Sequence, residues 1–256
     1  SMYSNIRLLD AINHPKDIIA TAIEKGLGGI CLTDHEALCG HIDFLQEYKK
    51  LKKANKLPEN FKIGLGNEIY LVSDLNPNHI TRYFHFILIA KNETGHQALK
   101  ELSSLAWYNS FVSRGMERVP TSYANLEYIV NKYPNSLIAT SACIGGELGY
   151  WVLQLVELEK KRKRDEDAIY DIKVKIVEFL NFCVKLFGED FYIEVAPSDS
   201  FEQYAFNERV RDIAQSLNIK IVIGTDAHYL TKQERFIHKA YLTSKNGERE
   251  VDAFYS

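Results

Sequence analysis

Residues 219–228 read IKIVIGTDAH, a run of mostly β-branched apolar residues that ends in an aspartate and a histidine. A short apolar run of this composition is typical of a buried β-strand. We predict five further strands of the same kind, from GGICLT (28–33), FKIGLGNEIYLV (61–72), RYFHFILIA (82–90), NSLIATSA (135–142) and DFYIEVA (190–196). The nearly continuous hydrophobicity of IKIVIG and FHFILIA favours strands that are covered on both faces, as in a barrel or a doubly wound sheet.

Segments with helical periodicity separate these strands. We expect helices over 15–25, 38–55, 92–108, 122–133 and 200–217, and a long helical stretch over 148–187. The alternation of strands and helices indicates an α/β protein with a mostly parallel sheet. The chain of 256 residues suits one α/β barrel, and no linker rich in glycine, serine or proline divides it, so we expect a single domain over residues 1–256.

Composition and charge limit the possible partners. With 46% hydrophobic and 25% charged residues, the chain has the composition of an ordinary globular protein. The net charge of −3 excludes an extended basic clamp for nucleic acid, so we expect DNA contact to be local or indirect. No apolar stretch approaches the ~18 residues of a membrane span, which predicts a cytoplasmic protein with no membrane partner.

We expect two further features of the sequence to have a structural role. Four cysteines without a C-x-x-C pair predict reduced thiols in a chain of this size. The charged run ELEKKRKRDED (157–167) carries acids on both sides of its basic residues. We expect this run to be a solvated helix or a connection between helices.

Polar side chains that can bind metals follow the predicted strands. They are Thr33-Asp34-His35 after GGICL, Asn67-Glu68 after GLG, His85 within RYFHF, Cys143 after NSLIATSA, and Thr225-Asp226-Ala227-His228 after IVIG. In a parallel barrel the carboxyl ends of the strands form the mouth of the active site. Histidine, cysteine and carboxylates are ligands of borderline divalent metals, so the pattern predicts a metal site there.

The spacing of these residues suggests their roles. On an extended chain Asp226 and His228 point the same way, so both can face one cavity. By the same alternation Asp34 points away from His35, which makes it a candidate for a carboxylate that orients an imidazole. The two oxygens of Glu68 could bridge two metal ions.

The ordered motifs resemble a known family, the PHP domain (polymerase and histidinol phosphatase) at the N-terminus of bacterial or phage DNA polymerase III alpha subunits. The segments that carry the resemblance are LLDAI (8–12), GICLTDHEALCGHIDF (29–44), GLGNEIYLV (64–72), FHFILIAKNETGHQALKELSSLAW (84–107), NSLIATSACIGGELG (135–149), FYIEVAP (191–197) and VIGTDAHYL (222–230). The resemblance implies a distorted seven-stranded β/α barrel, similar to a TIM barrel, and a cluster of three zinc, manganese or iron ions.

The same resemblance assigns ligands. Asp10, His35 and His228 would hold one metal, Glu68, His85 and Cys143 a second, and Glu68 with Asp226 half of a third. Family members supply two more ligands from an H-x-H motif on the first strand, where this chain has only Ser1 and Met2. We therefore expect fewer metals than a full cluster, and a barrel that lacks or alters its first strand and is open there.

Two functions compete. As the resemblance implies, the chain would be the N-terminal fragment of a polymerase, a nucleotidyltransferase whose paired catalytic aspartates it lacks. It would then be a structural module with weak or no phosphoesterase activity, with the rest of the alpha subunit and a proofreading exonuclease as partners. The alternative is an active metal-dependent phosphoesterase for phosphodiesters or phosphomonoesters, of a proofreading or pyrophosphate-removing kind. The missing histidines favour the first, because each histidine contributes a directed bond to a metal.

Overall fold

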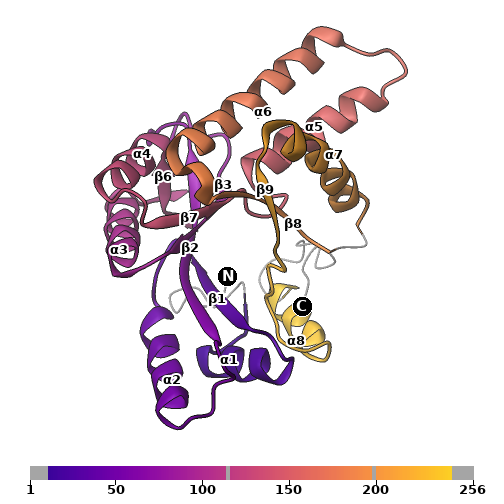
Figure 1. The fold of residues 1–256 in the computed structure, drawn as a ribbon. Coiled ribbons are helices and arrows are strands. Elements are labelled where there is room, and N and C mark those ends of the chain that lie inside the picture. The colour runs from indigo at the N-terminus through magenta and orange to yellow at the C-terminus, as the bar shows by residue number, and fades with distance from the viewer. Residues whose placement is uncertain (1–10, 114–115, 198–199, 244–256) are drawn as a thin grey trace.

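The computed structural model describes residues 11–113, 116–197 and 200–243. Its helices and strands alternate over most of the chain, as predicted (Figure 1). The helices are α1 (Pro15–Glu24), α2 (His41–Lys53), α3 (Glu93–Tyr108), α4 (Tyr123–Lys132), α5 (Glu147–Lys160), α6 (Glu166–Phe187), η1 (Gly188–Asp190), α7 (Phe201–Leu217) and α8 (Glu234–Thr243). The strands are β1 (Gly29–His35), β2 (Lys62–Val72), β3 (Phe84–Ala90), β4 (Phe111–Ser113), β5 (Met116–Arg118), β6 (Pro120–Ser122), β7 (Leu137–Thr140), β8 (Phe191–Val195) and β9 (Lys220–Ile223).

The strands form a curled, open sheet with helices around it, which is a distorted α/β barrel (Figure 1). The order is β1-β2-β3-β7-β8-β9, and the short strand β6 pairs with the end of β2. The sheet is mostly parallel as predicted, but β3 runs antiparallel to both of its neighbours. Its direction follows from the connection over residues 73–83, which contains no helix to carry the chain back across the sheet.

Three helices begin one residue after a side chain that caps them. The side chains of Asn92, Ser122 and Ser200 accept hydrogen bonds from backbone N–H groups in the first turns of α3, α4 and α7. The predicted long helical stretch is two helices, because the chain leaves α5 at Lys161 and re-enters a helix after the Asp165 cap. Residues 161–167 are exposed, so the charged run connects two helices as expected.

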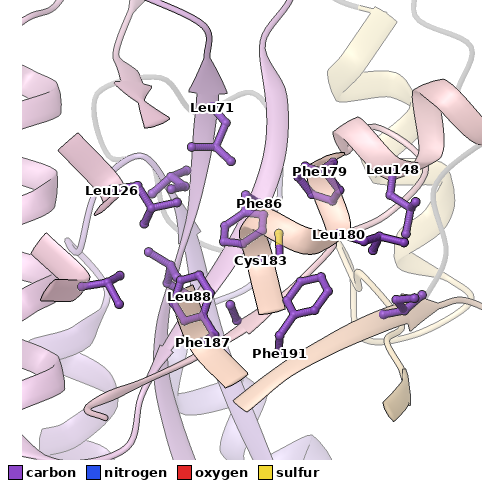
Figure 2. Packing of buried hydrophobic residues seen from close by; sticks show 14 of the residues in the cluster. Leu71, Phe86, Leu88, Leu126, Leu148, Phe179, Leu180, Cys183, Phe187 and Phe191 are labelled. Atoms are coloured by element: carbon purple, nitrogen blue, oxygen red, sulfur yellow. The ribbon is translucent and has the colours of Figure 1, made fainter. Parts of the chain in front are cut away.

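The main hydrophobic core lies between the sheet and the helices α3 to α7 (Figure 2). Phe86 on β3 is fully buried at its centre. The ring of Phe86 stacks on Phe191 with centroids 6.5 Å apart and also contacts Phe179 and Phe187. A second, smaller cluster packs α1 and α2 against β1, and it consists of Ile18, Ile19, Ala22, Leu32, Phe44 and Phe61.

The prediction that IKIVIG is covered on both faces is wrong. All four residues of β9 are exposed, and the side chain of Ile223 reaches 71% exposure. The reason is position, because β9 is the last strand of the sheet and no strand in the described ranges pairs with its outer edge. Among the described strands none joins β9 to β1, and the expectation that the barrel lacks or alters its first strand stays a prediction. Residues 1–10, where a first strand would have to lie, are outside the described residues.

Two other expectations concern the cysteines and the membrane. Cys31, Cys39, Cys143 and Cys183 are all free thiols, as predicted. None of the described helices combines the length and the apolar character that a membrane crossing requires.

We expect Phe86→Ala to lower the free energy of unfolding by about 3–5 kcal/mol, because it leaves a cavity among three aromatic rings. Urea unfolding followed by circular dichroism measures this change. Tyr108→Ala is the matched control, because Tyr108 is 89% exposed at the end of α3 and its truncation should cost less than about 0.5 kcal/mol. Equal losses of unfolding free energy in the two variants would contradict the place of Phe86 at the centre of the core.

Candidate metal centre

Three neighbouring strands bring His35, Glu68 and His85 together. His35 ends β1 and is in register with Glu68 on the parallel strand β2. His85 is the second residue of the antiparallel strand β3, so the start of β3 lies at the same end of the sheet as the end of β1. These residues were predicted to lie at the ends of strands. Glu68 instead lies in the middle of β2, which continues to Val72.

The carboxylate of Glu68 lies between two imidazoles. Its Oε1 atom is 2.7 Å from Nδ1 of His85 and 3.7 Å from Nδ1 of His35. Glu68 is 2% exposed, so water does little to stabilise its charge. The hydroxyl of Tyr70 lies 3.2 Å from Nδ1 of His35, which places a third polar group on the same side of β2. Tyr70 was not among the predicted site residues.

This arrangement favours charge on both partners. Burial opposes ionisation of Glu68, but His35 and His85 outweigh it and hold the pKa of this carboxyl well below its usual range. Burial likewise opposes protonation of His85, but Glu68 and the Cys143 side chain raise the pKa of the imidazole well above its usual range. The contact between Glu68 and His85 therefore favours an ionised carboxylate beside a protonated imidazole.

Cys143 reaches the same histidine from the loop after β7. The backbone N–H of His85 donates to the carbonyl of Gly145 at 3.2 Å, and Sγ of Cys143 lies 3.6 Å from Nδ1 of His85. The loop is tight, since a Cβ on Gly146 would lie 2.2 Å from the carbonyl oxygen of Ser141, and Ala142 has a φ of 58°. Burial raises the pKa of the Cys143 thiol.

Asp226 and His228 come from the loop after β9, and their backbone differs from the extended chain that the sequence analysis assumed. Asp226 has a φ of 44°, so the chain turns there. Nδ1 of His228 consequently lies 2.7 Å from the carbonyl oxygen of Asp226 itself. Asp10 lies outside the described residues, but Ile12 donates a backbone hydrogen bond to the carbonyl of His228 at 3.3 Å. Its part in a site with His35 and His228 stays a prediction.

Hydrogen bonds to several parts of the chain hold the turn after β1 in place. Oδ2 of Asp34 accepts a hydrogen bond from the backbone N–H of Gly40 at 2.9 Å, just before α2. Glu36 has a φ of 56°, and its carbonyl accepts hydrogen bonds from Ser103 and Trp107 on α3. Asp34 therefore helps to shape the turn, while its role in orienting an imidazole stays a prediction.

A further carboxylate, Glu194 on β8, was not among the predicted site residues. It is 7% exposed, and the hydroxyl of Thr140 donates to its Oε2 atom at 2.6 Å. Gly224 makes room for it, because a Cβ there would lie 1.9 Å from Oε1 of Glu194. Burial raises the pKa of Glu194 to about 7, and Asp226 and Glu68 add to this effect. The sequence contains one signal for it, because Glu194 is the single carboxylate within the apolar strand FYIEV (191–195).

The donor chemistry around His85 suits a divalent metal, whereas the spacing is that of a hydrogen-bonded network. Donors around one tetrahedral zinc ion lie about 3.3–3.7 Å apart. The 3.6 Å between Cys143 and His85 fits this spacing, but the 2.7 Å between Glu68 and His85 is a hydrogen-bond distance. Within the described residues no three histidine, cysteine or acidic side chains are arranged to hold one ion. A metal would have to separate Glu68 from His85.

Comparison with known proteins identifies the family to which the chain belongs. The chain is a member of the PHP domain family, whose model matches residues 2–198. It is 42% identical to a protein described as probable DNA polymerase YorL of Bacillus subtilis strain 168, over 98% of this chain and 20% of that protein. It is 31% identical to DNA polymerase III subunit alpha of Borreliella burgdorferi, again over 98% of this chain and 20% of the relative.

These relatives confirm the resemblance to the PHP domain of polymerase III alpha subunits. The chain spans about a fifth of the length of the curated relatives it matches. Among solved structures, an amidohydrolase from Chromobacterium violaceum aligns with a TM-score of 0.48 and 11% identity, over 91% of this chain and 93% of that one.

We expect the contribution of Glu194 to the stability of the protein to fall between pH 5 and pH 8. Its pKa is raised from 4.5 to about 7, so the folded state favours the protonated carboxyl and stability is lost as the pH rises through this interval. Glu194→Gln keeps a neutral amide there and should remove up to about 3 kcal/mol of this loss. Urea midpoints at both pH values, measured with a chelator present, test it.

The control for this measurement is Glu24→Gln, which neutralises an exposed carboxylate on α1. It should follow the wild-type pH dependence. A Glu194→Gln curve parallel to that of the wild type would show that the buried carboxyl does not control this pH dependence.

Proposed function

We propose that this chain is the PHP domain of a replicative DNA polymerase of the polymerase III alpha type. In this proposal it binds divalent metal and serves mainly as a structural and partner-binding module, with weak or no phosphoesterase activity. It works in the cytoplasm beside the rest of the polymerase and a proofreading exonuclease. The observations that support the proposal are the family match over residues 2–198 and the His85 network, which carries the donor chemistry of a metal centre.

The metal part of the proposal rests on His85 and its two neighbours. Glu68, His85 and Cys143 offer oxygen, nitrogen and sulfur donors, a combination that suits zinc and tolerates manganese or iron. When bound, such an ion supplies Lewis acidity toward a phosphoryl oxygen. The chain's own part is to keep the Glu68 carboxylate ionised and to hold His85 against the loop of Gly145.

One observation favours the alternative of an active phosphoesterase. The buried Glu68 carboxylate lies between His35 and His85, one imidazole on each side, and this is the placement that a carboxylate shared between two metal sites needs. Asp226 also lies close enough for its charge to raise the pKa values of Cys143 and Glu194. The alternative therefore requires the loop after β9 to contribute ligands.

We expect the purified protein to bind fewer than three tightly held metal ions. Elemental analysis after incubation with zinc or manganese and removal of free metal measures the number. His85→Ala should lose about one equivalent, because it removes the nitrogen that both Glu68 and Cys143 approach. His79→Ala is the control, since His79 is an exposed histidine outside the site. Three tight equivalents in the wild type would contradict the proposal.

We expect at most weak hydrolysis of a generic phosphodiester, because catalysis needs a metal cluster that positions the nucleophile in line with the leaving oxygen. The assay compares the wild type with Glu68→Ala, Asp226→Asn and His228→Ala in added manganese or zinc. Brisk turnover that disappears in these three variants and persists in His79→Ala would establish the active enzyme in place of the structural module.

A further inference from the structure

Helix α6 carries a row of side chains on its outer surface, separate from the face that packs on the core. α6 has 22 residues, and its first half extends beyond the sheet together with the end of α5 (Figure 1). Six of its residues are buried and face the main core. At 3.6 residues per turn, the row is rotated from that buried face by roughly 120°. It consists of Tyr170, Val174, Val177, Asn181 and Val184.

The apolar members of this row are open to solvent. Tyr170, Val177 and Val184 are 68%, 45% and 41% exposed, and Val174 is partly exposed. None of these four belongs to the hydrophobic clusters of the described chain. Valine is also a poor helix former, because its branched side chain is restricted against the preceding turn. The row therefore helps neither the core nor the helix itself, which indicates a surface for a partner.

The spacing of the row fits another α-helix as that partner. Its five members are alternately four and three positions apart, which is the spacing of the a and d positions in a coiled coil. Val174 and Asn181 take a positions, and Tyr170, Val177 and Val184 take d positions. Side chains with this spacing enter the holes between side chains of a second helix that crosses at a small angle.

Asn181 favours a second copy of α6 as the partner helix. In a parallel pair in register, Asn181 would face the same residue of the second copy, and the two amides could form a hydrogen bond. In an antiparallel pair it would face an apolar d residue such as Tyr170 or Val177. A single asparagine at an a position is a known determinant of the register of two-stranded coiled coils.

The charges beside the row fit the same arrangement. Lys173 and Glu178 are both exposed and take g and e positions. In a parallel pair, Lys173 of each copy would lie beside Glu178 of the other, which gives two ion pairs. Glu166 and Asp171 take the equivalent positions at the start of the helix and would repel. Both are exposed, so water and salt weaken this repulsion.

We propose that α6 binds α6 of a second copy of this protein, as a short parallel coiled coil. One pair of helices of this length buries less surface than the roughly 1,200–2,000 Å² of a stable complex, so the association is weak. It would join two proteins that other contacts already bring close together. The proposal goes beyond the metal-binding module, because it involves neither the metal donors nor a phosphoester.

The experiment measures dimerisation of the purified protein by sedimentation equilibrium at concentrations up to about 1 mM, because the contact is small. A chelator keeps the result independent of the metal-binding proposal. A reducing agent prevents disulfides between the exposed thiols of Cys31 and Cys39. We expect the wild type to form dimers reversibly, in a fraction that rises with protein concentration.

Two substitutions in the row have opposite expected effects. Val177→Glu should weaken the dimer at least about tenfold, because it places two like charges in the contact. Asn181→Val should strengthen it about fivefold, because a polar a position lowers the stability of a coiled coil. Ile42→Glu is the matched control, since Ile42 is a 66% exposed residue of α2, and its dimer should stay within about twofold of the wild type. Circular dichroism shows that each variant is folded.

Charge reversal tests the parallel register. Lys173→Glu and Glu178→Lys should each weaken the dimer about threefold or more at low salt, and the double variant should restore it. A wild type that stays monomeric at about 1 mM would overturn the proposal, as would a dimer that is equally strong in Val177→Glu and Ile42→Glu. A dimer weakened by Asn181→Val, or not restored in the double variant, would refute the parallel coiled coil.

Discussion

The buried carboxylate of Glu68 is the constraint on which the centre of this fold depends. An ionised carboxylate at 2% exposure costs several kcal/mol unless charged or hydrogen-bonding groups compensate it. The compensation comes from His35 and His85, which reach Glu68 only when β1, β2 and β3 pair in the observed register. A shift of either neighbouring strand by one residue would turn its histidine away from the carboxylate. The register of the sheet therefore determines whether the site residues meet, and their interaction in turn favours this register.

The sequence predicts most elements of this fold because their signals are local. Apolar runs mark β1, β2, β3, β7, β8 and β9, and capping side chains at Asn92, Ser122 and Ser200 mark helix starts to within a residue. The direction of β3 and the exposure of β9 depend on which strands become neighbours. That information is not local, and the apolar residues of β9 look the same in sequence whether a further strand covers them or not.

The residues of the candidate site likewise include some that the sequence predicts and some that it does not. His35, Glu68, His85 and Cys143 carry recognisable donor chemistry, and their motifs place them in one family, so their convergence could be foreseen. Tyr70 could not be foreseen in this way, because a tyrosine on a strand is ordinary and only the fold brings its hydroxyl to His35. The turn at Asp226 could not be foreseen either, because aspartate adopts both extended and left-handed backbone and the sequence does not show which one it takes here.

The left-handed backbone at Glu36, Ala142 and Asp226 has a consequence for how this domain can diverge. Each of these residues lies within two positions of a candidate metal ligand, and none is glycine. Glycine, asparagine and aspartate adopt this conformation most readily, and a β-branched residue scarcely does. Random mutation at positions 36, 142 and 226 should therefore be tolerated for a narrow set of residues, even though their side chains are not all donors. Backbone geometry therefore restricts which substitutions can accumulate at these positions, even where the side chain has no chemical role.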